Sequence, residues 1–122
     1  MKNTIYTLPE DRFVAGQTRG YMWRLYRESG QPFNANGCEG KFALIDYSHK
    51  DEEPILVKDV NFIVGDEGLM NIISLELAPK DTVNLCGKYI YQLSIKDAEG
   101  NSEVPNQGLF YISNNIHKSF VV

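Results

Sequence analysis

Cysteine and histidine are scarce in this chain of 122 residues, which has two of each. Cys38 and Cys86 are too few for a disulfide framework, and neither lies in a Cys-x-x-Cys motif or a Cys/His cluster. We therefore expect two reduced, half-buried thiols, as in a protein made in a cytoplasm. Nothing in the spacing of His49 and His117 places them beside a nucleophile or in a metal-ligand set.

Long apolar runs and an excess of basic residues are also missing. No run approaches the roughly 20 residues that a membrane helix needs, and no stretch of signal-peptide length precedes Pro9. Twelve basic and sixteen acidic side chains give a net charge of −4, which argues against a surface that follows phosphates. We expect a protein that binds neither nucleic acid nor membrane.

Nucleotide-binding and catalytic motifs are absent. The sequence has neither a GxxxxGK(S/T) loop nor a strand-borne GxGxxG. Asp97, Glu99 and Asn101 alternate like calcium ligands, but Gly100 and the lack of a bidentate Glu put them out of register with an EF-hand, so a turn is expected. We predict that the chain is not an enzyme, with no catalytic, cofactor-binding or metal-binding residue and no cofactor. Paired carboxylates of the glycosidase type stay open, because their spacing is three-dimensional.

What the sequence does contain is a series of short apolar runs bounded by turn residues, without a helical stripe of eleven or more residues. This pattern predicts strands, with one helical turn beginning at Pro79 in the polar crossing 78–87. Strands are expected at 3–8, 11–15, 20–27, 41–47, 55–64, 69–78, 88–96 and 105–113.

Strict alternation of apolar and polar residues marks the core-facing side of several strands. Asp97 and Asn101, on either side of Gly100, predict a hairpin turn before the last strand. Seven or eight strands with regular turn signals predict an all-β sandwich of one domain over 1–122, in which 114–122 is a possible C-terminal extension. Tyr21, Trp23 and Leu25 form the predicted core-facing side of their strand. In the later strands, the residues predicted to share one face are Ile73, Leu75 and Leu77, then Tyr89, Tyr91, Leu93 and Ile95, then Phe110 and Ile112.

The segment LAPKDTVNLCGKYIY at 77–91, with the hairpin and GLFYI after it, resembles immunoglobulin-like domains at the N-terminus of phage baseplate upper proteins. The likeness covers the C-terminal part of the chain well and the first part loosely. It implies an immunoglobulin-like antiparallel β-sandwich of about seven or eight strands. The matching positions are Leu77, Pro79, Asp81, Thr82, Gly87, Tyr89, Tyr91, Asp97, Gly100, Asn101, Gly108 and Phe110.

Two features of this segment bear on how the two sheets are joined. Tyr89 or Tyr91 can hydrogen-bond back to the crossing as a tyrosine corner, and Tyr91 is the expected residue. Cys86 precedes the tyrosines, whereas the immunoglobulin intersheet cysteine follows its Tyr by two residues. A bridge between Cys38 and Cys86 is therefore not implied.

The resemblance also implies a function. A chain of this family would be a non-enzymatic structural module of a phage or prophage tail or baseplate, made in the bacterial cytoplasm and carried in the virion tail. Its partners would be like copies or other baseplate proteins, docked through a sheet edge or a loop end. The apolar tail SFVV at 119–122 is either a strand that pairs with a partner, or a terminus that is frayed or folded back on its own sheet.

Two rival functions remain open. A carbohydrate-binding module would use exposed aromatic rings, and a small hydrolase would need a cleft with a perturbed carboxylate. Cross-strand packing is the plain alternative role for the rings in question. The candidates on the less apolar faces of their strands are Tyr6, Tyr26, Tyr47 and Tyr111.

Overall fold

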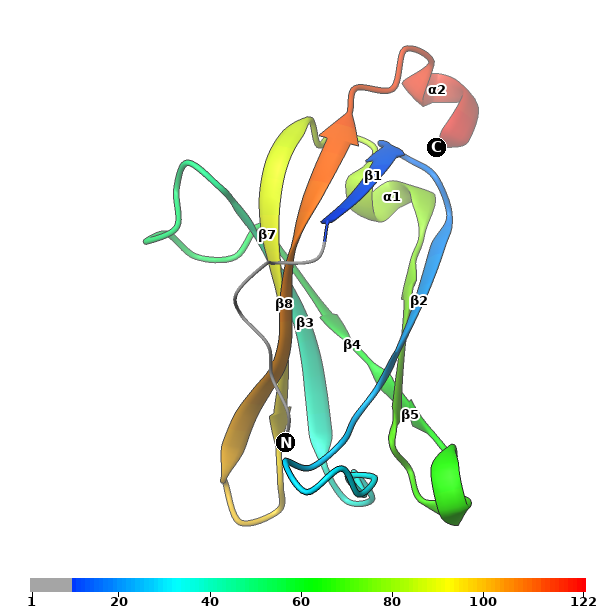
Figure 1. Cartoon of the computed structure of the whole chain (residues 1–122). Coiled ribbons are helices and arrows are strands. Elements are labelled where there is room, and N and C mark those ends of the chain that lie inside the picture. Colours follow the sequence, from blue (N-terminus) through cyan, green and yellow to red (C-terminus); the bar gives the residue numbers. More distant parts are fainter. Residues whose placement is uncertain (1–9) are drawn as a thin grey trace.

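The computed structural model describes residues 10–122, which form a sandwich of two β-sheets around one core. Five strands are paired in the order β1-β8-β7-β3-β4 and three in the order β2-β6-β5 (Figure 1). The expected strand at 3–8 lies outside the described residues. The strands are β1 (Glu10–Val14), β2 (Arg19–Arg24), β3 (Glu39–Asp46), β4 (Leu56–Asp59), β5 (Asn61–Ile63), β6 (Ile72–Leu77), β7 (Gly87–Lys96) and β8 (Ser102–Ser113).

This strand order is that of an immunoglobulin-like sandwich. Strands β2, β6 and β5 correspond to B, E and D of the immunoglobulin fold, and β8, β7 and β3 correspond to G, F and C. The predicted all-β sandwich of about seven or eight strands is confirmed, with eight strands in residues 10–122. One pair departs from the antiparallel prediction, because β1 runs parallel to β8.

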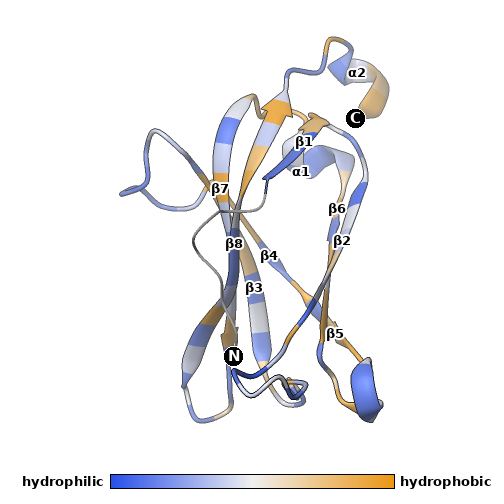
Figure 2. Ribbon diagram, in the orientation of Figure 1, coloured by the Kyte–Doolittle hydropathy of each residue, from blue (hydrophilic) through white to orange (hydrophobic). Residues whose placement is uncertain are grey.

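The alternation read from the sequence places the core correctly. Leu25 and the predicted residues of β6, β7 and β8 are buried, while Tyr21 and Trp23 are half-buried and packed against them. Figure 2 shows hydrophobic and hydrophilic segments alternating along the strands. The predicted helical turn is α1 (Pro79–Thr82), and a 3₁₀ turn, η1 (Asp66–Gly68), follows β5.

Tyr91 of β7 lies at the centre of this core. Its ring centroid is 4.9 Å from Phe110, 5.8 Å from Phe42 and 5.9 Å from Trp23, so it joins strands of both sheets. The ring fits because β8 has no side chain opposite it. A Cβ at Gly108 would lie 2.5 Å from Cζ and Oη of Tyr91.

The predicted strand 55–64 is wrong as a single element, because the chain changes sheets at Val60. Strand β4 pairs with β3 in one sheet and β5 pairs with β6 in the other. Val60 is buried at the crossing. Its Cγ2 atom lies 2.5 Å from the position that a Cβ on Gly40 would take, so only glycine fits at position 40. A continuous apolar run does not reveal such a change of sheet.

The final strand begins three residues before its predicted start at Pro105. Its pairing with β7 shifts between Leu93 and Ile95, where β8 supplies an extra residue. Such a bulge accommodates a proline, which cannot donate a ladder hydrogen bond, and so the strand continues on both sides of Pro105.

The tyrosine corner belongs to Tyr89, and the prediction that favoured Tyr91 is wrong. The backbone N–H of Cys86 donates to the Tyr89 hydroxyl at 3.0 Å, and this hydroxyl donates to the Cys86 carbonyl at 3.1 Å. The Tyr91 hydroxyl instead donates to Asn106 Oδ1 at 2.8 Å. The two tyrosines are neighbours on the same face of β7, and only Tyr89 forms the corner.

The C-terminal tail is not a strand. Residues 118–121 form a helical turn, α2 (Lys118–Val121), and Val121 lies against Gly16 near the end of β1. The tail therefore contacts its own domain at Val121, while Ile116, Phe120 and Val122 are exposed, and it pairs with neither sheet.

Polar clusters join the two sheets on both open sides of the sandwich. On one side, Asp11 Oδ2 of β1 accepts hydrogen bonds from Arg19 and Tyr21 of β2, both at 2.5 Å. Burial and the bond to Asp11 raise the pKa of Tyr21 to about 12. On the other side, Lys58 Nζ of β4 donates to Asp81 Oδ2 of α1 at 2.6 Å.

We predict that Gly108→Ala destabilises the fold by about 1–3 kcal/mol or more, because its Cβ would enter the space of the packed Tyr91 ring. Gly20→Ala is the matched control, since a Cβ there meets nothing within 4 Å. It should be neutral or stabilising by about 0.5 kcal/mol. Urea unfolding compares the two, and equal midpoints for both variants would contradict the packing argument.

A second prediction concerns Asp81. Burial tends to raise its pKa, but the hydrogen bonds from Lys58 and the Ala78 N–H outweigh this and lower it. A lowered folded-state pKa adds stability above the unfolded pKa of about 3.9, and this contribution is lost as pH falls through the folded-state value. Asp81→Asn should thus cost about 1–3 kcal/mol at pH 7, and the cost should shrink below about pH 4.

Asp59→Asn is the control for this measurement. The Asp59 carboxylate pairs with Lys41 but is 80% exposed, against 10% for Asp81. Its loss should change the free energy of unfolding by less than about 0.5 kcal/mol at either pH. A cost of Asp81→Asn that is undiminished at pH 3 would contradict the assignment.

Candidate functional site

The candidate site is the outer face of the five-stranded sheet, which we call the sheet face. Cross-strand pairing sets Ala43 of β3 beside Gln92 of β7, and Ile45 beside Ile90. Val57 of β4 pairs with Ala43 on its other side and is 55% exposed. Apolar side chains from three strands thus lie together on the side away from the core, with Gln92 among them.

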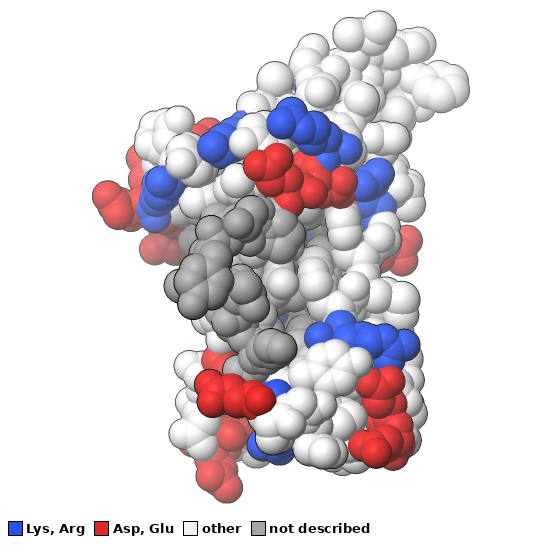
Figure 3. Space-filling view, in the orientation of Figure 1, with Lys and Arg blue, Asp and Glu red and all other residues white. Residues whose placement is uncertain are grey.

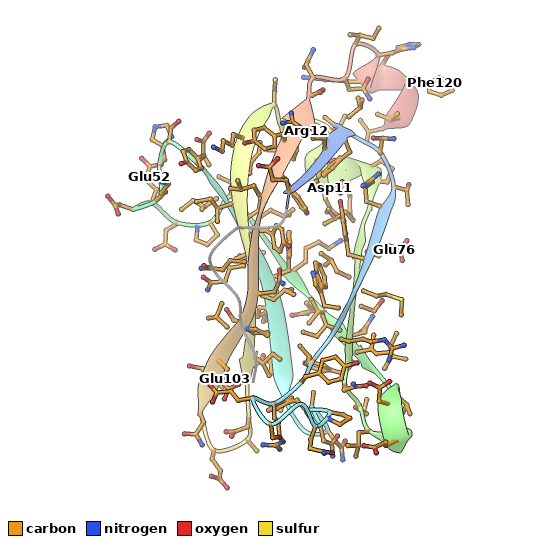
Figure 4. All side chains as sticks on the ribbon, viewed as in Figure 1. Asp11, Arg12, Glu52, Glu76, Glu103 and Phe120 are labelled. Carbon is orange, nitrogen blue, oxygen red and sulfur yellow. The ribbon has the colours of Figure 1, made fainter. Side chains whose placement is uncertain are left out.

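A hollow of about 200 Å³ opens among these side chains. The loop between β3 and β4 borders it through Lys50 and Pro54 and carries the exposed acidic residues 51–53. Figure 4 shows Glu52 at the projecting end of this loop. An apolar hollow beside a charged loop suits the side chain of another protein. The complete lining is Ala43, Leu44, Ile45, Lys50, Pro54, Ile90 and Gln92.

Cations and tyrosine rings alternate along one end of the sheet face. Arg12 of β1 lies 4.2 Å from the ring centroid of Tyr111 in β8, and Lys88 Nζ of β7 lies 5.6 Å from the same centroid. Lys88 and Lys50 also lie 3.8 and 4.0 Å from the ring centroid of Tyr47. Figure 3 shows basic groups near this end of the strands, with acidic groups beside them. The rings hold the cations in place through cation–π attraction.

The charges of Lys50 and Lys88 are not neutralised by a neighbouring carboxylate. Among the ion pairs within residues 10–122, neither lysine takes part, whereas Arg12 faces Glu10 at 3.9 Å. The sheet face therefore presents an apolar centre with positive charge along one rim and an acidic loop along another.

The structure separates the tyrosines that the sequence proposed for sugar binding. Tyr47 and Tyr111 flank Lys88, with Tyr47 37% exposed, but cations lie over both rings. Tyr26 is elsewhere, and its hydroxyl donates to Asp66 at 2.7 Å, which raises the pKa of Tyr26. Tyr6 lies outside the described residues. The three described rings do not form a common platform.

Sequence reasoning missed the hollow and the row of cations. The alternation along β7 already predicted that Lys88 and Ile90 lie on the face away from the core-facing tyrosines. This was the one signal in the sequence that could have located the site. The alignment of Ile90 with Ile45, and of Lys88 with Tyr111, depends on strand register. Register joins residues far apart in the chain, so the apolar surface and the cationic row could not be read from either strand alone.

The hairpin turn that resembled a calcium loop is held by its own backbone. Asp97 Oδ1 accepts hydrogen bonds from the N–H groups of Glu99 and Asn101 at 2.9 and 3.0 Å, and Gly100 has a φ of 89°. Within residues 10–122, no group of three or more His, Cys, Asp or Glu side chains could hold a metal ion. In the same range, no helix is long and apolar enough to cross a membrane.

Comparison with known proteins adds no family assignment. No protein-family model matches the chain, and no curated protein matches it. The likeness of the 77–91 segment to baseplate domains remains a prediction from the sequence.

The two cysteines are unpaired, and their surroundings differ. Cys86 is exposed, whereas Cys38 is half-buried. Burial, with the negative charges of Asp97 and Glu103, raises the pKa of the Cys38 thiol. Because the thiolate is the reactive form, the two thiols should differ in rate.

We predict that without reductant the native protein shows one fast and one slow thiol toward Ellman's reagent, and that unfolding makes both fast. Cys86→Ser should remove the fast phase and Cys38→Ser the slow one. Fewer than about one reactive thiol per chain after unfolding would mean that the cysteines are bridged, against the reduced state expected of cytoplasmic thiols.

Proposed function

We propose that the chain is a non-enzymatic module that acts by protein–protein assembly in a phage or prophage tail or baseplate. The observation that carries the assembly role is the apolar hollow of the sheet face with its charged rims. The tail location is supported by the likeness of the 77–91 segment to baseplate domains. In this proposal the protein is made in the bacterial cytoplasm and carried in the virion tail.

The sheet face supports binding better than the two edges of the five-stranded sheet do. Strand β4 has four residues and follows Pro54, and β1 carries Glu10, Asp11 and Arg12. Short length, proline and charge are the means by which natural proteins protect an edge from pairing. The apolar surface across β3, β7 and β4, in which Val57 is exposed and Ala43, Ile45 and Ile90 are half-buried, has no such protection, and its burial would contribute about 25 cal/mol per Å².

The composition of the hollow supports a binding role over catalysis. Its lining has one charged side chain, Lys50, and one amide, Gln92, and the remaining residues are apolar. Nucleophilic or acid–base catalysis needs a base held against a reacting group, and none of the lining side chains is a His, Cys, Asp or Glu.

A carbohydrate-binding module is the second candidate, favoured by the exposure of Tyr47 beside the hollow. Sugar stacking needs a free ring face, and Lys50 and Lys88 both lie within 4.0 Å of the ring centroid of Tyr47. A glycan array separates the two functions: glycan binding that Tyr47→Ala abolishes would favour the carbohydrate module.

We predict that the chain occurs at a fixed copy number in tail particles purified from the strain that carries its gene. Ile90→Glu should lower its incorporation by about tenfold or more, since a charge in the hollow must be desolvated on binding. Met22→Glu, on the exposed outer side of the small sheet, is the matched control and should be incorporated normally. Thermal melts confirm that both variants fold. Absence of the wild-type chain from the particles, measured by mass spectrometry, would refute the tail assignment.

A further inference from the structure

The C-terminal arm, residues 116–122, exposes apolar side chains that the domain itself does not cover. Ile116 is 98% exposed, Phe120 81% and Val122 64%, the three highest values for large apolar side chains within residues 10–122. Figure 4 shows Phe120 projecting away from the sandwich at the end of the chain. Exposed apolar groups gathered on one projecting segment mark an interaction site.

The arm is attached to the domain by its other side. Asn115 Nδ2 donates to the Ala15 carbonyl at 2.8 Å, and Asn115 Oδ1 accepts the N–H of His117 at 2.7 Å. Val121 Cγ2 lies 3.0 Å from the position that a Cβ on Gly16 would take. With its inner side fixed, the arm presents Phe120 in a defined direction, which lowers the entropy cost of binding.

We propose that the arm of one copy inserts Phe120 into the hollow of the sheet face of a second copy. The hollow has a volume of about 200 Å³ and is lined mainly by apolar side chains. A cavity of about 150 Å³ lined by apolar residues holds a benzene molecule in an engineered core, so a phenyl ring fits a hollow of this size. This inference rests on the proposed assembly function, because it names the partner of the sheet face.

Charge favours the same pairing. The arm carries Lys118 beside Phe120, and the loop after β3, which borders the hollow through Lys50 and Pro54, carries the exposed acidic residues 51–53. Neither Lys118 nor any of residues 51–53 takes part in an ion pair within residues 10–122. With Phe120 in the hollow, Lys118 comes close to the acidic loop of the second copy, so unpaired opposite charges meet across the contact.

The two halves of the contact lie on different sides of one molecule. Figure 4 shows Phe120 and Glu52 projecting at opposite sides of the sandwich, so the anchored arm does not reach its own hollow. A contact between two different surfaces is heterologous and builds rings or open chains of subunits. Such growth suits a component of a multi-subunit assembly.

Light scattering on the full chain at increasing concentration tests the contact. The wild type should associate, whereas Phe120→Ser, which lacks the inserted ring, and Ile90→Glu, which blocks the hollow, should each stay monomeric. Mixing these two variants leaves one intact arm and one intact hollow, and should give a 1:1 heterodimer that grows no further. Met22→Ser is the control for loss of an exposed apolar side chain and should associate like the wild type.

A charge exchange tests the orientation. Lys118→Glu and Glu52→Lys should each weaken association by about two- to fivefold, and the double variant should recover most of the loss. Melting curves of each variant test whether weakened association comes from unfolding. Ile116→Ser is a second variant of the arm for the same measurement.

A wild type that is monomeric up to about 1 mM, or an Ile90→Glu variant that still associates alone, would overturn the inference. These outcomes leave the tail function testable separately, because incorporation into particles through another protein needs no contact between copies. Conversely, a chain that associates through its arm but is absent from tail particles would refute the function and leave the contact standing.

Discussion

The packing of Tyr91 against Gly108 is the constraint on which the rest of the sandwich depends. The ring lies among Trp23, Phe42 and Phe110, and so contacts side chains from both sheets. An immunoglobulin domain fastens its sheets at this level with a disulfide and a tryptophan. Here aromatic packing serves that purpose, which allows the cysteines to lie elsewhere and remain unpaired.

The two open sides of the sandwich are closed by polar groups. Asp11 joins β1 to β2, and Lys58 joins β4 to α1. The carboxylates of these contacts, Asp11 and Asp81, both have a lowered pKa. Their hydrogen bonds stabilise the charged form, and this effect outweighs that of burial. Polar contacts thus lie along the edge strands β1, β2 and β4, and the binding surfaces proposed above are the outer face and the projecting arm.

The outward-facing residues of the strands form the cationic row and the hollow. The core-facing residues of β7 make the fold, whereas Lys88 and Ile90 on the other side of the same strand contribute to the cationic row and the hollow. The arm adds Phe120, which is 81% exposed and contacts the ring of His117. Both features follow from ordinary strand and turn geometry, and the proposed contact surface is built from side chains that point away from the core.

The sequence by itself determined the all-β class, the inner faces of β2, β6, β7 and β8, the helical turn at Pro79 and the turn at Gly100, because each depends on neighbouring residues and their alternation. It also named Tyr47 and Tyr111 as surface rings. Only the tertiary structure decided the change of sheet at Val60, the parallel β1–β8 pair, the corner at Tyr89 and the hollow at Ile90. These features depend on strand register and on contacts between segments far apart in the chain, and a local sequence pattern determines neither.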